Sequence, residues 1–302
     1  MNAPTPEQQT PGPQTSTTTA AAAAAATTAA PALGTTTIGV LGGMSWESTA
    51  LYYRLANELV REHRALGAGN EPGEPLASAD LLVRSLDFAR VRELQLADRW
   101  DVAADQLRRE GLALAGAGAG VVVLATNYMH KAAGPLEEAL TERGVRFLHL
   151  ADVVAAAALA RGVRSVGLLG AGGTMTEPFY VERLAASGVE VVAPDAAGVA
   201  RVDHAVFGEL CRGVFSPATR ADLAAVVAGL VDRGAQAVGL CCTELELLLG
   251  PDDVPAGVPL LPSARLHVEA ALAAAGQVPA QVPARGPVRA PMAEPRLVGG
   301  AV

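Results

Sequence analysis

Hydrophobic and polar residues alternate along this chain in two regular ways. Short apolar runs, rich in valine, isoleucine and leucine, are separated by longer stretches whose apolar residues recur at helical spacing. This pattern predicts βα units that feed a mostly parallel sheet, with helices between the strands. The predicted strands cover residues 37–41, 80–84, 120–125, 165–169, 189–193 and 237–241.

Two helices have clear sequence signals at their ends. One should begin near Ser45, with Glu47 in its positively polarised first turn and one apolar face formed by Leu51, Leu55 and Leu59. Another should begin at Ser216 as N-cap with Pro217 in the first turn, and end before Gly234. Its apolar residues at helical spacing are Leu223, Val226, Val227 and Leu230.

A weak internal repeat indicates how these units are organised. IGVLGGM at 38–44 is similar to VGLLGAGGTM at 166–175, and VVVLATN at 121–127 is similar to VGLCCTE at 238–244. The repeat predicts an α/β fold of two pseudo-symmetric βα halves with mostly parallel sheets. Ligands of such sheets bind beyond the carboxyl ends of the strands, so we expect a site in the cleft between the halves. The alignment of the repeats places Ala125 opposite Cys242.

The composition divides the chain into four segments. Half of the residues are hydrophobic but only 4% are aromatic, so alanine, valine and leucine must fill the cores. Residues 1–34 and 276–302 are rich in Pro, Thr, Ala or Gly, and we predict them to be disordered tails. The first α/β half should span 35–150 and the second 151–275, with the last helix able to pack back on the first half.

Charge and cysteine content restrict the partners and the location. The net charge of −8 and the scattered basic residues argue against nucleic acid as a partner. No apolar stretch has the length and flanks of a membrane span, and no basic residue precedes the alanine run at the N-terminus, as a signal peptide would require. The three cysteines, two of them adjacent, provide no disulfide framework. We therefore expect a cytoplasmic protein.

Cys242 is the leading candidate for chemistry. It ends a predicted buried strand, where the backbone N–H groups of a following helix would favour a thiolate and lower the pKa of the thiol. The alternative is that Cys242 is a small core residue, as free cysteines usually are. Cys241 should point to the opposite face of the strand, into the core.

Other polar residues near strand ends have both a functional and a structural interpretation. The glycine loops at 42–43 and 170–173 lack a full dinucleotide or P-loop motif, and they fit tight turns beside a small carboxylate or turn glycines alone. Thr126 and Asn127 could bind a carboxylate or cap a helix. His130 and His267 lack the paired spacing of a metal site, so no metal is expected. Among basic residues, Arg84 and Arg201 lie nearest the predicted loops.

Four motifs resemble the site loops of the aspartate/glutamate racemase family: GGMSWEST at 42–49, ATNYMHK at 125–131, GAGGTM at 170–175 and CCTE at 241–244. The resemblance runs from about residue 37 to 272. It implies two α/β halves, no cofactor, and two cysteines that flank the α-carbon of an amino-acid substrate, one of them Cys242. It also implies substrate-binding roles for Met44, Ser45, Thr126, Asn127, Thr174, Arg201 and Thr243, with Arg201 at a distal carboxylate.

The chain departs from the family pattern at two places. Ala125 stands where the first cysteine is expected, and Pro262 and Ser263 stand where relatives often have Asp-Thr. Racemisation without a cofactor needs an acid and a base on opposite faces of the α-carbon, and a missing partner should cost about 10²–10⁴-fold in rate. Water or Tyr128, the nearest titratable side chain, could replace it.

Three functions follow from these observations. The first is a cofactor-independent racemase of aspartate, glutamate or a related amino acid, with Cys242 as thiol acid/base. The second is a single-cysteine lyase or decarboxylase that protonates one face of a carbanion. The third is a protein that binds an amino acid or dicarboxylate without turnover. In each case the partner is a small molecule, and we expect a homodimer.

Overall fold

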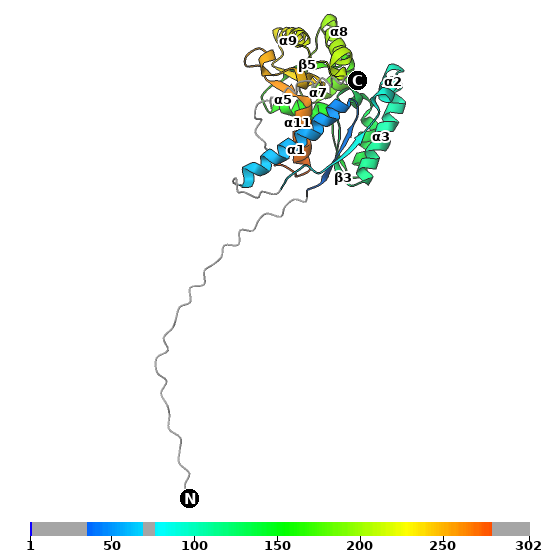
Figure 1. Ribbon diagram of the computed structural model, residues 1–302, viewed down its shortest axis with the longest axis vertical. Helices are drawn as coiled ribbons and strands as arrows, with labels where there is room; N and C mark the ends of the chain where they lie inside the picture. The colour runs from blue at the N-terminus through cyan, green and yellow to red at the C-terminus, as the bar shows by residue number, and fades with distance from the viewer. Residues whose placement is uncertain (2–34, 69–75, 280–302) are drawn as a thin grey trace, which may run out of the picture. The chain divides into compact units, whose positions relative to one another are not determined.

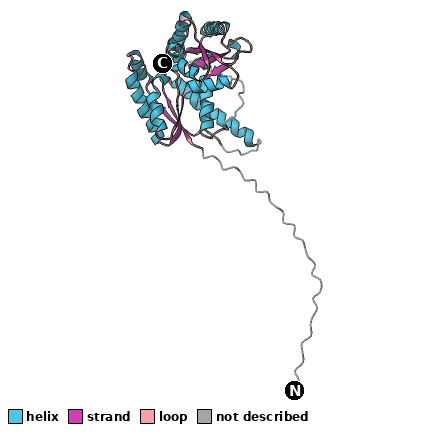
Figure 2. Cartoon of the chain, turned by 180° about the vertical axis from the view of Figure 1, so that it is seen from behind, coloured by secondary structure: helices cyan, strands magenta, loops and turns pink. Residues whose placement is uncertain are grey.

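The computed structural model describes Met1 and residues 35–68 and 76–279. The predicted N-terminal tail after Met1, and the predicted C-terminal tail from residue 280 onward, lie outside the described residues. In the part that is described, two four-stranded sheets follow one another along the chain, with helices packed against them (Figures 1 and 2).

All strand pairs within the two sheets are parallel, as the sequence predicts. The first sheet has the order β2-β1-β3-β4 and the second has the order β6-β5-β7-β8, so the two halves share one topology. The strands are β1 (Thr37–Gly42), β2 (Leu81–Ser85), β3 (Ala119–Leu124), β4 (Arg146–Leu148), β5 (Ser165–Gly170), β6 (Glu190–Val192), β7 (Ala237–Cys241) and β8 (Leu260–Pro262). All six predicted strands are present, and the fold of two pseudo-symmetric α/β halves is confirmed.

Sequence analysis missed the edge strands β4 and β8. Each has three residues, and each pairs with only one neighbour. Such a short run gives a weak strand signal; β6 is equally short, but the valine-rich segment VEVVA at 189–193 made it recognisable.

The helices connect the strands and cover the sheets. They are α1 (Trp46–Ala68), α2 (Phe88–Leu96), α3 (Trp100–Gly116), α4 (Gly134–Thr141), α5 (Leu150–Leu159), α6 (Gly172–Thr176), α7 (Pro178–Ala186), α8 (Ala196–His204), α9 (Pro217–Asp232), α10 (Leu245–Leu248) and α11 (Ser263–Ala274). Single turns of 3₁₀ or π helix occur at Tyr128–Ala132, Ala205–Glu209, Leu210–Arg212 and Pro251–Asp253.

Both helix predictions made from end signals are confirmed. Helix α1 begins at Trp46 with Glu47 in its first turn, and the three leucines of its predicted apolar face are buried. Helix α9 begins at Pro217, and the hydroxyl of Ser216 accepts the backbone N–H of Thr219 at 3.0 Å. All four residues of its predicted apolar spacing are buried.

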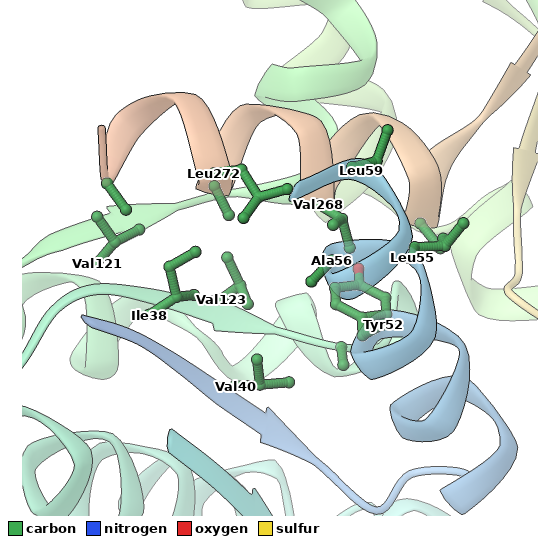
Figure 3. Packing of buried hydrophobic residues seen from close by; sticks show 14 of the residues in the cluster. Ile38, Val40, Tyr52, Leu55, Ala56, Leu59, Val121, Val123, Val268 and Leu272 are labelled. Atoms are coloured by element: carbon green, nitrogen blue, oxygen red, sulfur yellow. The ribbon is translucent and has the colours of Figure 1, made fainter. Parts of the chain in front are cut away.

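Each sheet has apolar cores on both faces. In the first half, α1 and α11 cover the face formed by Ile38, Val40, Val121 and Val123 (Figure 3), and α3 and α4 cover the other face. Helix α11 follows the last strand of the second sheet but packs beside α1, and Val268 and Leu272 contribute to that core. This crossing joins the two halves through apolar contacts.

Candidate active site

A narrow pocket lies where the carboxyl ends of β1, β3, β5 and β7 converge. Its lining comes from both halves: Met44, Phe88, Gln95, Thr126, Asn127 and Tyr128 from the first, and Ala171, Thr174, Val206, Phe207, Cys211, Cys241, Cys242, Thr243 and Glu244 from the second. Six of the eight residues singled out from the sequence therefore line one pocket. Ser45 adjoins it, whereas Arg201 does not.

The strand register determines which residues of the two halves are equivalent. In the first sheet Leu41 of β1 pairs with Leu124 of β3. In the second sheet Leu169, which occupies the same place in β5 as Leu41 in β1, pairs with Leu240 of β7. Leu124 and Leu240 are thus the equivalent positions.

This register corrects the sequence alignment of the halves by one residue. Ala125 is equivalent to Cys241, and Thr126 is equivalent to Cys242. Ala125 is fully buried in the core with Val121 and Val123, and Cys241 is buried in the core of the second half. Because successive residues of a strand face opposite sides, a shift of one residue exchanges core and pocket. The residue opposite Cys242 is therefore Thr126 rather than Ala125.

The thiol of Cys242 donates a hydrogen bond to a carboxylate oxygen of Glu244 at 3.0 Å. Burial raises the pKa of Cys242 well above its usual value, and the negative charge of Glu244 raises it further. The sequence-based expectation of a lowered pKa was therefore wrong. A backbone hydrogen bond at Glu244 does favour the thiolate, but burial and the carboxylate outweigh it.

Glu244 is a buried polar centre that the sequence analysis overlooked. Its carboxylate accepts hydrogen bonds from Ser45 and Ser48 of the first half, and from Cys242 and Thr243 of the second. Ser48 also hydrogen-bonds Thr243. Ser45, predicted to touch substrate, hydrogen-bonds Glu244 and is not among the residues that line the pocket. The position of Glu244 directly after Cys242 and Thr243 was the available signal.

Thr126 and Asn127 form the opposite wall. The Asn127 amide donates to Ser263 at 3.1 Å and accepts from Tyr180 at 2.9 Å. The ring of His130 is held by the backbone N–H of Leu150, which donates to Nε2, so Nδ1 carries the proton and donates to the carbonyl of Thr126 at 2.8 Å. Both residues are therefore held in fixed positions.

Tyr128 lies beside this wall with its hydroxyl already engaged. It donates to Glu177 at 2.9 Å, and burial followed by this hydrogen bond raises the pKa of the phenol. A Cβ atom at Gly173 would lie 2.1 Å from the tyrosine ring, so the glycine loop of the second half admits an aromatic side chain of the first. Tyr128 is poorly suited to replace a catalytic thiol.

Thr174 is completely buried in the pocket lining. Its hydroxyl oxygen makes no hydrogen bond to any described residue. A buried hydroxyl without a partner costs free energy, about 1–3 kcal/mol, unless a ligand supplies one. Thr174 thus has the capacity to bind a polar substrate group.

The basic residue near the pocket is Arg92 and not the predicted Arg201. Arg201 is half-exposed on α8 and forms an ion pair with Asp222 at 3.2 Å. The guanidinium of Arg92 stacks over the pocket residue Phe207, 4.1 Å from the ring centre, and donates to Gln95, which also lines the pocket. It forms no ion pair with any described carboxylate, which leaves its charge available to an anion.

Cys211 brings a second thiol to the second-half wall. Burial and the nearby charges of Glu244 and Glu47 raise the pKa of Cys211, and the charge of Arg92 opposes them weakly. At neutral pH the thiols of Cys211 and Cys242 are therefore protonated. No sequence motif pointed to Cys211.

Ion pairs join the two halves beside the pocket. Lys131 of the first half contacts Glu177 of the second at 2.6 Å. Arg183 on α7 binds Glu137 on α4 with both terminal nitrogens and also contacts Asp152. The halves are thus held together by apolar contacts at α11 and by charged contacts here.

Within the described ranges, no group of His, Cys, Asp or Glu side chains is arranged to hold a metal ion. Nor does any described helix have the length and hydropathy to cross a membrane. The arrangement defines a class of protein: two α/β halves with a narrow pocket between them that is lined by thiol, hydroxyl and carboxyl groups.

Comparison with known proteins identifies the family. Residues 41–271 match the family model Asp/Glu/Hydantoin racemase. A protein of Yersinia pestis, named as a candidate Asp/Glu racemase, has 35% sequence identity and a TM-score of 0.69, over 80% of this chain and 99% of its own. An aspartate racemase homologue from Pyrococcus horikoshii OT3 has 30% identity and a TM-score of 0.64 over the same shares. The chain belongs to the Asp/Glu/hydantoin racemase family.

The fold itself extends to more distant relatives. The aspartate racemase of Picrophilus torridus superposes with a TM-score of 0.58 at 17% identity, covering 80% of this chain and 94% of its own. The match to the family model confirms the family resemblance inferred from the four motifs.

Proposed function

We propose that this protein is a cofactor-independent racemase of acidic amino acids, with Cys242 on one face of the substrate α-carbon and Thr126 on the other. One observation carries the proposal: the two residues occupy equivalent register positions in the two halves, and both line the same pocket. An acid/base pair on opposite walls is the requirement for racemisation.

Glu244 gives Cys242 access to the thiolate form. When the thiol passes its proton to the Glu244 carboxylate, the thiolate can remove the α-proton and become a thiol again. The resulting carbanion returns to the starting enantiomer if Cys242 gives the proton back. It inverts if Thr126, or a water that Thr126 orients, donates a proton to the opposite face. That donor then regains a proton from solvent, and Glu244 releases its own to solvent. Ser45, Ser48 and Thr243 hold the Glu244 carboxylate at the distance that this transfer needs.

The two faces are chemically unequal. A threonine hydroxyl is a much weaker acid than a thiol, so protonation from the Thr126 side, by the hydroxyl itself or by a water that it orients, is the slower event. Carbanions formed by Cys242 should therefore return to the starting enantiomer more often than they invert. Exchange of the α-proton with solvent is expected to outpace racemisation for one enantiomer.

Three further polar groups account for an acidic amino-acid substrate. The free hydroxyl of Thr174 and the remaining amide hydrogen of Asn127 can bind the α-carboxylate. Arg92 can bind the side-chain carboxylate, because its guanidinium is stacked on Phe207 and has no carboxylate partner among the described residues. Met44 contributes an apolar wall.

The test is α-deuterium uptake and chiral composition, followed together in D₂O for single enantiomers of aspartate and glutamate. Racemisation accompanied by faster exchange in one enantiomer supports the proposal. Measurable binding of both amino acids without any exchange would replace it with the binding-protein alternative.

The protonated state of Cys242 also favours a second function, one-face protonation after decarboxylation. A substituted malonate that loses carbon dioxide leaves a carbanion, and the Cys242 thiol would deliver its proton to one face. The test is release of carbon dioxide and formation of one product enantiomer from such malonates. This activity would have to disappear in Cys242→Ser.

We also propose a cytoplasmic homodimer. All three cysteines are free thiols, which suits a reducing compartment. Light scattering coupled to size-exclusion chromatography tests the dimer, since a monomer mass would contradict it.

A further inference from the structure

A second and larger cavity lies away from the active-site pocket and shares no lining residue with it. It is formed by α1, α10, the segment that follows α10, and α11, and its volume is about 610 Å³. This volume falls within the range of small-molecule sites, roughly 300–1,000 Å³. The walls are mainly aliphatic and include Leu51, Leu55, Leu240, Leu247, Leu249 and Leu260.

Of the charged residues of this cavity, one arginine has no carboxylate partner of its own in the described part of the chain. Arg265 is paired with Glu269 at 2.9 Å, and Arg54 lies 3.9 Å from Glu58. Arg161, at the end of α5, forms no ion pair with a described carboxylate, and its guanidinium donates to a backbone carbonyl. The remaining carboxyl group is that of Glu246.

Glu246 adds little negative charge at neutral pH. Burial raises the pKa of its carboxyl group to about 8, although backbone N–H donors at the start of α11 oppose the shift. The carboxyl group is therefore mostly protonated near pH 7. The charge of Arg161 acts on Glu269, which is already paired with Arg265, so the three arginines of the cavity exceed its ionised carboxylates by one. An aliphatic cavity with one spare guanidinium favours an apolar molecule that has a single anionic group.

A chain of hydrogen bonds connects this cavity with the active site. Glu246 accepts from the backbone N–H of Ala264 at 2.6 Å and from the hydroxyl of Ser263 at 3.3 Å. The same hydroxyl accepts from the side chain of Asn127 at 3.1 Å, and Tyr180 donates to the other end of that amide. Asn127 lines the active-site pocket, whereas Glu246 lines the second cavity.

Helix α10 provides a second connection. It comprises only Leu245–Leu248 and directly follows Glu244, the hydrogen-bond partner of Cys242. Leu247 faces the second cavity, so a ligand there would contact the helix that positions Glu244. Both links start from α10, because Glu246 and Leu247 belong to that helix, and they lead to the two walls of the active site.

We propose that the second cavity is a regulatory site for a monoanionic amphiphile, a carboxylate with a hydrocarbon chain, and that its occupancy changes the environment of Asn127. The aliphatic walls bury the chain and Arg161 binds the carboxylate. Binding requires no catalytic turnover, so this inference stands apart from the racemase proposal and can fail separately.

Calorimetric titration tests the ligand class. Decanoate, below its micellar concentration, is the probe, with decan-1-ol and decyltrimethylammonium as neutral and cationic counterparts. We expect saturable 1:1 binding of decanoate, weakened at least about fivefold by Arg161→Gln and unchanged by Arg143→Gln, an exposed arginine elsewhere. Failure of decanoate to bind would overturn the site. Equal binding of all three probes, or indifference to Arg161→Gln, would overturn the assignment of an anionic ligand.

Nuclear magnetic resonance tests the connection with the active site, without substrate and without turnover. The side-chain amide signal of Asn127 should shift when decanoate saturates the cavity, and the shift should become smaller in Ser263→Ala. Melting temperature and decanoate affinity of that variant serve as controls for folding and for an intact cavity. An Asn127 signal that stays in place under saturating decanoate would overturn the regulatory part of the proposal.

Discussion

Thr126 and Cys242 occupy the same place in the two halves of this protein, two residues beyond the equivalent leucines Leu124 of β3 and Leu240 of β7. One wall of the pocket therefore presents a hydroxyl and the other a thiol. The strand order is the same in both sheets and the register matches where these strands end, so the two walls differ in their side chains.

Replacing Cys242 by serine should lower α-proton exchange at least about 100-fold, because the thiol that removes the proton is lost. Cys241→Ala is the matched control. Its side chain is buried in the core, so it should retain exchange activity and lose about 1–2 kcal/mol of stability. The measurements are deuterium uptake by mass spectrometry and urea unfolding. Equal exchange activity of the two variants would contradict the assignment.

Thr126→Cys should bring a second thiol to the pocket and raise the ratio of racemisation to exchange about tenfold, because both faces then have a competent acid. Ala125→Cys, one residue earlier, should leave that ratio unchanged since residue 125 is buried in the core. Chiral chromatography of aspartate after incubation in D₂O gives the ratio. The reverse ranking of the two variants would restore Ala125 as the position opposite Cys242.

Glu244→Gln should make Cys242 easier to alkylate while it slows turnover. The carboxylate raises the pKa of Cys242, so removing its charge shifts the pH midpoint of alkylation downward by about one unit. Turnover should fall because the thiol loses its proton acceptor. Peptide mapping after iodoacetamide treatment at several pH values measures the first effect. Glu177→Gln, which removes a carboxylate bonded to Lys131 and Tyr128, should leave Cys242 alkylation as it was.

Arg92→Met should raise KM for aspartate and glutamate at least about tenfold, with a smaller effect on kcat, since the guanidinium binds a group remote from the reacting carbon. Methionine keeps an apolar side chain over Phe207, and Arg92→Lys should recover part of the affinity. Arg201→Met is the control because that arginine is paired with Asp222. Steady-state kinetics would contradict the assignment if Arg201→Met had the larger effect.

Three buried histidines should make the protein acid-sensitive. Burial lowers the pKa of His130 to about 3 and that of His267 to about 4, and it also lowers the pKa of His149. The unfolded chain binds protons below about pH 6.5 while the folded histidines stay neutral, so stability falls as pH drops from there toward 4, by up to roughly 1.4 kcal/mol per pH unit for each histidine.

Glu246 acts in the opposite direction. Its raised pKa means that the folded state binds the extra proton between about pH 4.5 and 8, which adds stability as pH falls. Three histidines outweigh one carboxyl group, so the urea midpoint should decrease from pH 7 to pH 5. In Glu246→Gln the decrease should be steeper. A urea midpoint that rises toward pH 5 would contradict this account.

Sequence patterns were sufficient for the architecture but not for the finest detail of the site. The apolar strands and the helix starts at Ser45 and Ser216 follow from local physical chemistry, and the structure confirms them. The alignment of the repeats failed by one residue, because two cysteines in succession, Cys241 and Cys242, offered two ways of matching the halves. Only hydrogen-bond register between strands distinguishes them.

The contacts that cross between the halves were also beyond sequence reasoning. Glu244 bonds to Ser45 and Ser48, residues almost 200 positions away along the chain. Arg92 was missed because its importance depends on Phe207 beneath it and on the lack of a described carboxylate partner. Neither condition is visible in a local pattern.

The ion pairs beside the pocket should make the entry of substrate sensitive to ionic strength. Lys131–Glu177 and Arg183–Glu137 join the halves through partly exposed charges, whereas α1 and α11 join them through buried apolar surface. Salt screens the first kind of contact and not the second, with a Debye length of about 10 Å at 0.1 M and about 3 Å at 1 M. Added salt should therefore weaken the contacts between the halves on the charged side while the fold stays intact. Access of substrate to the pocket should then depend on ionic strength.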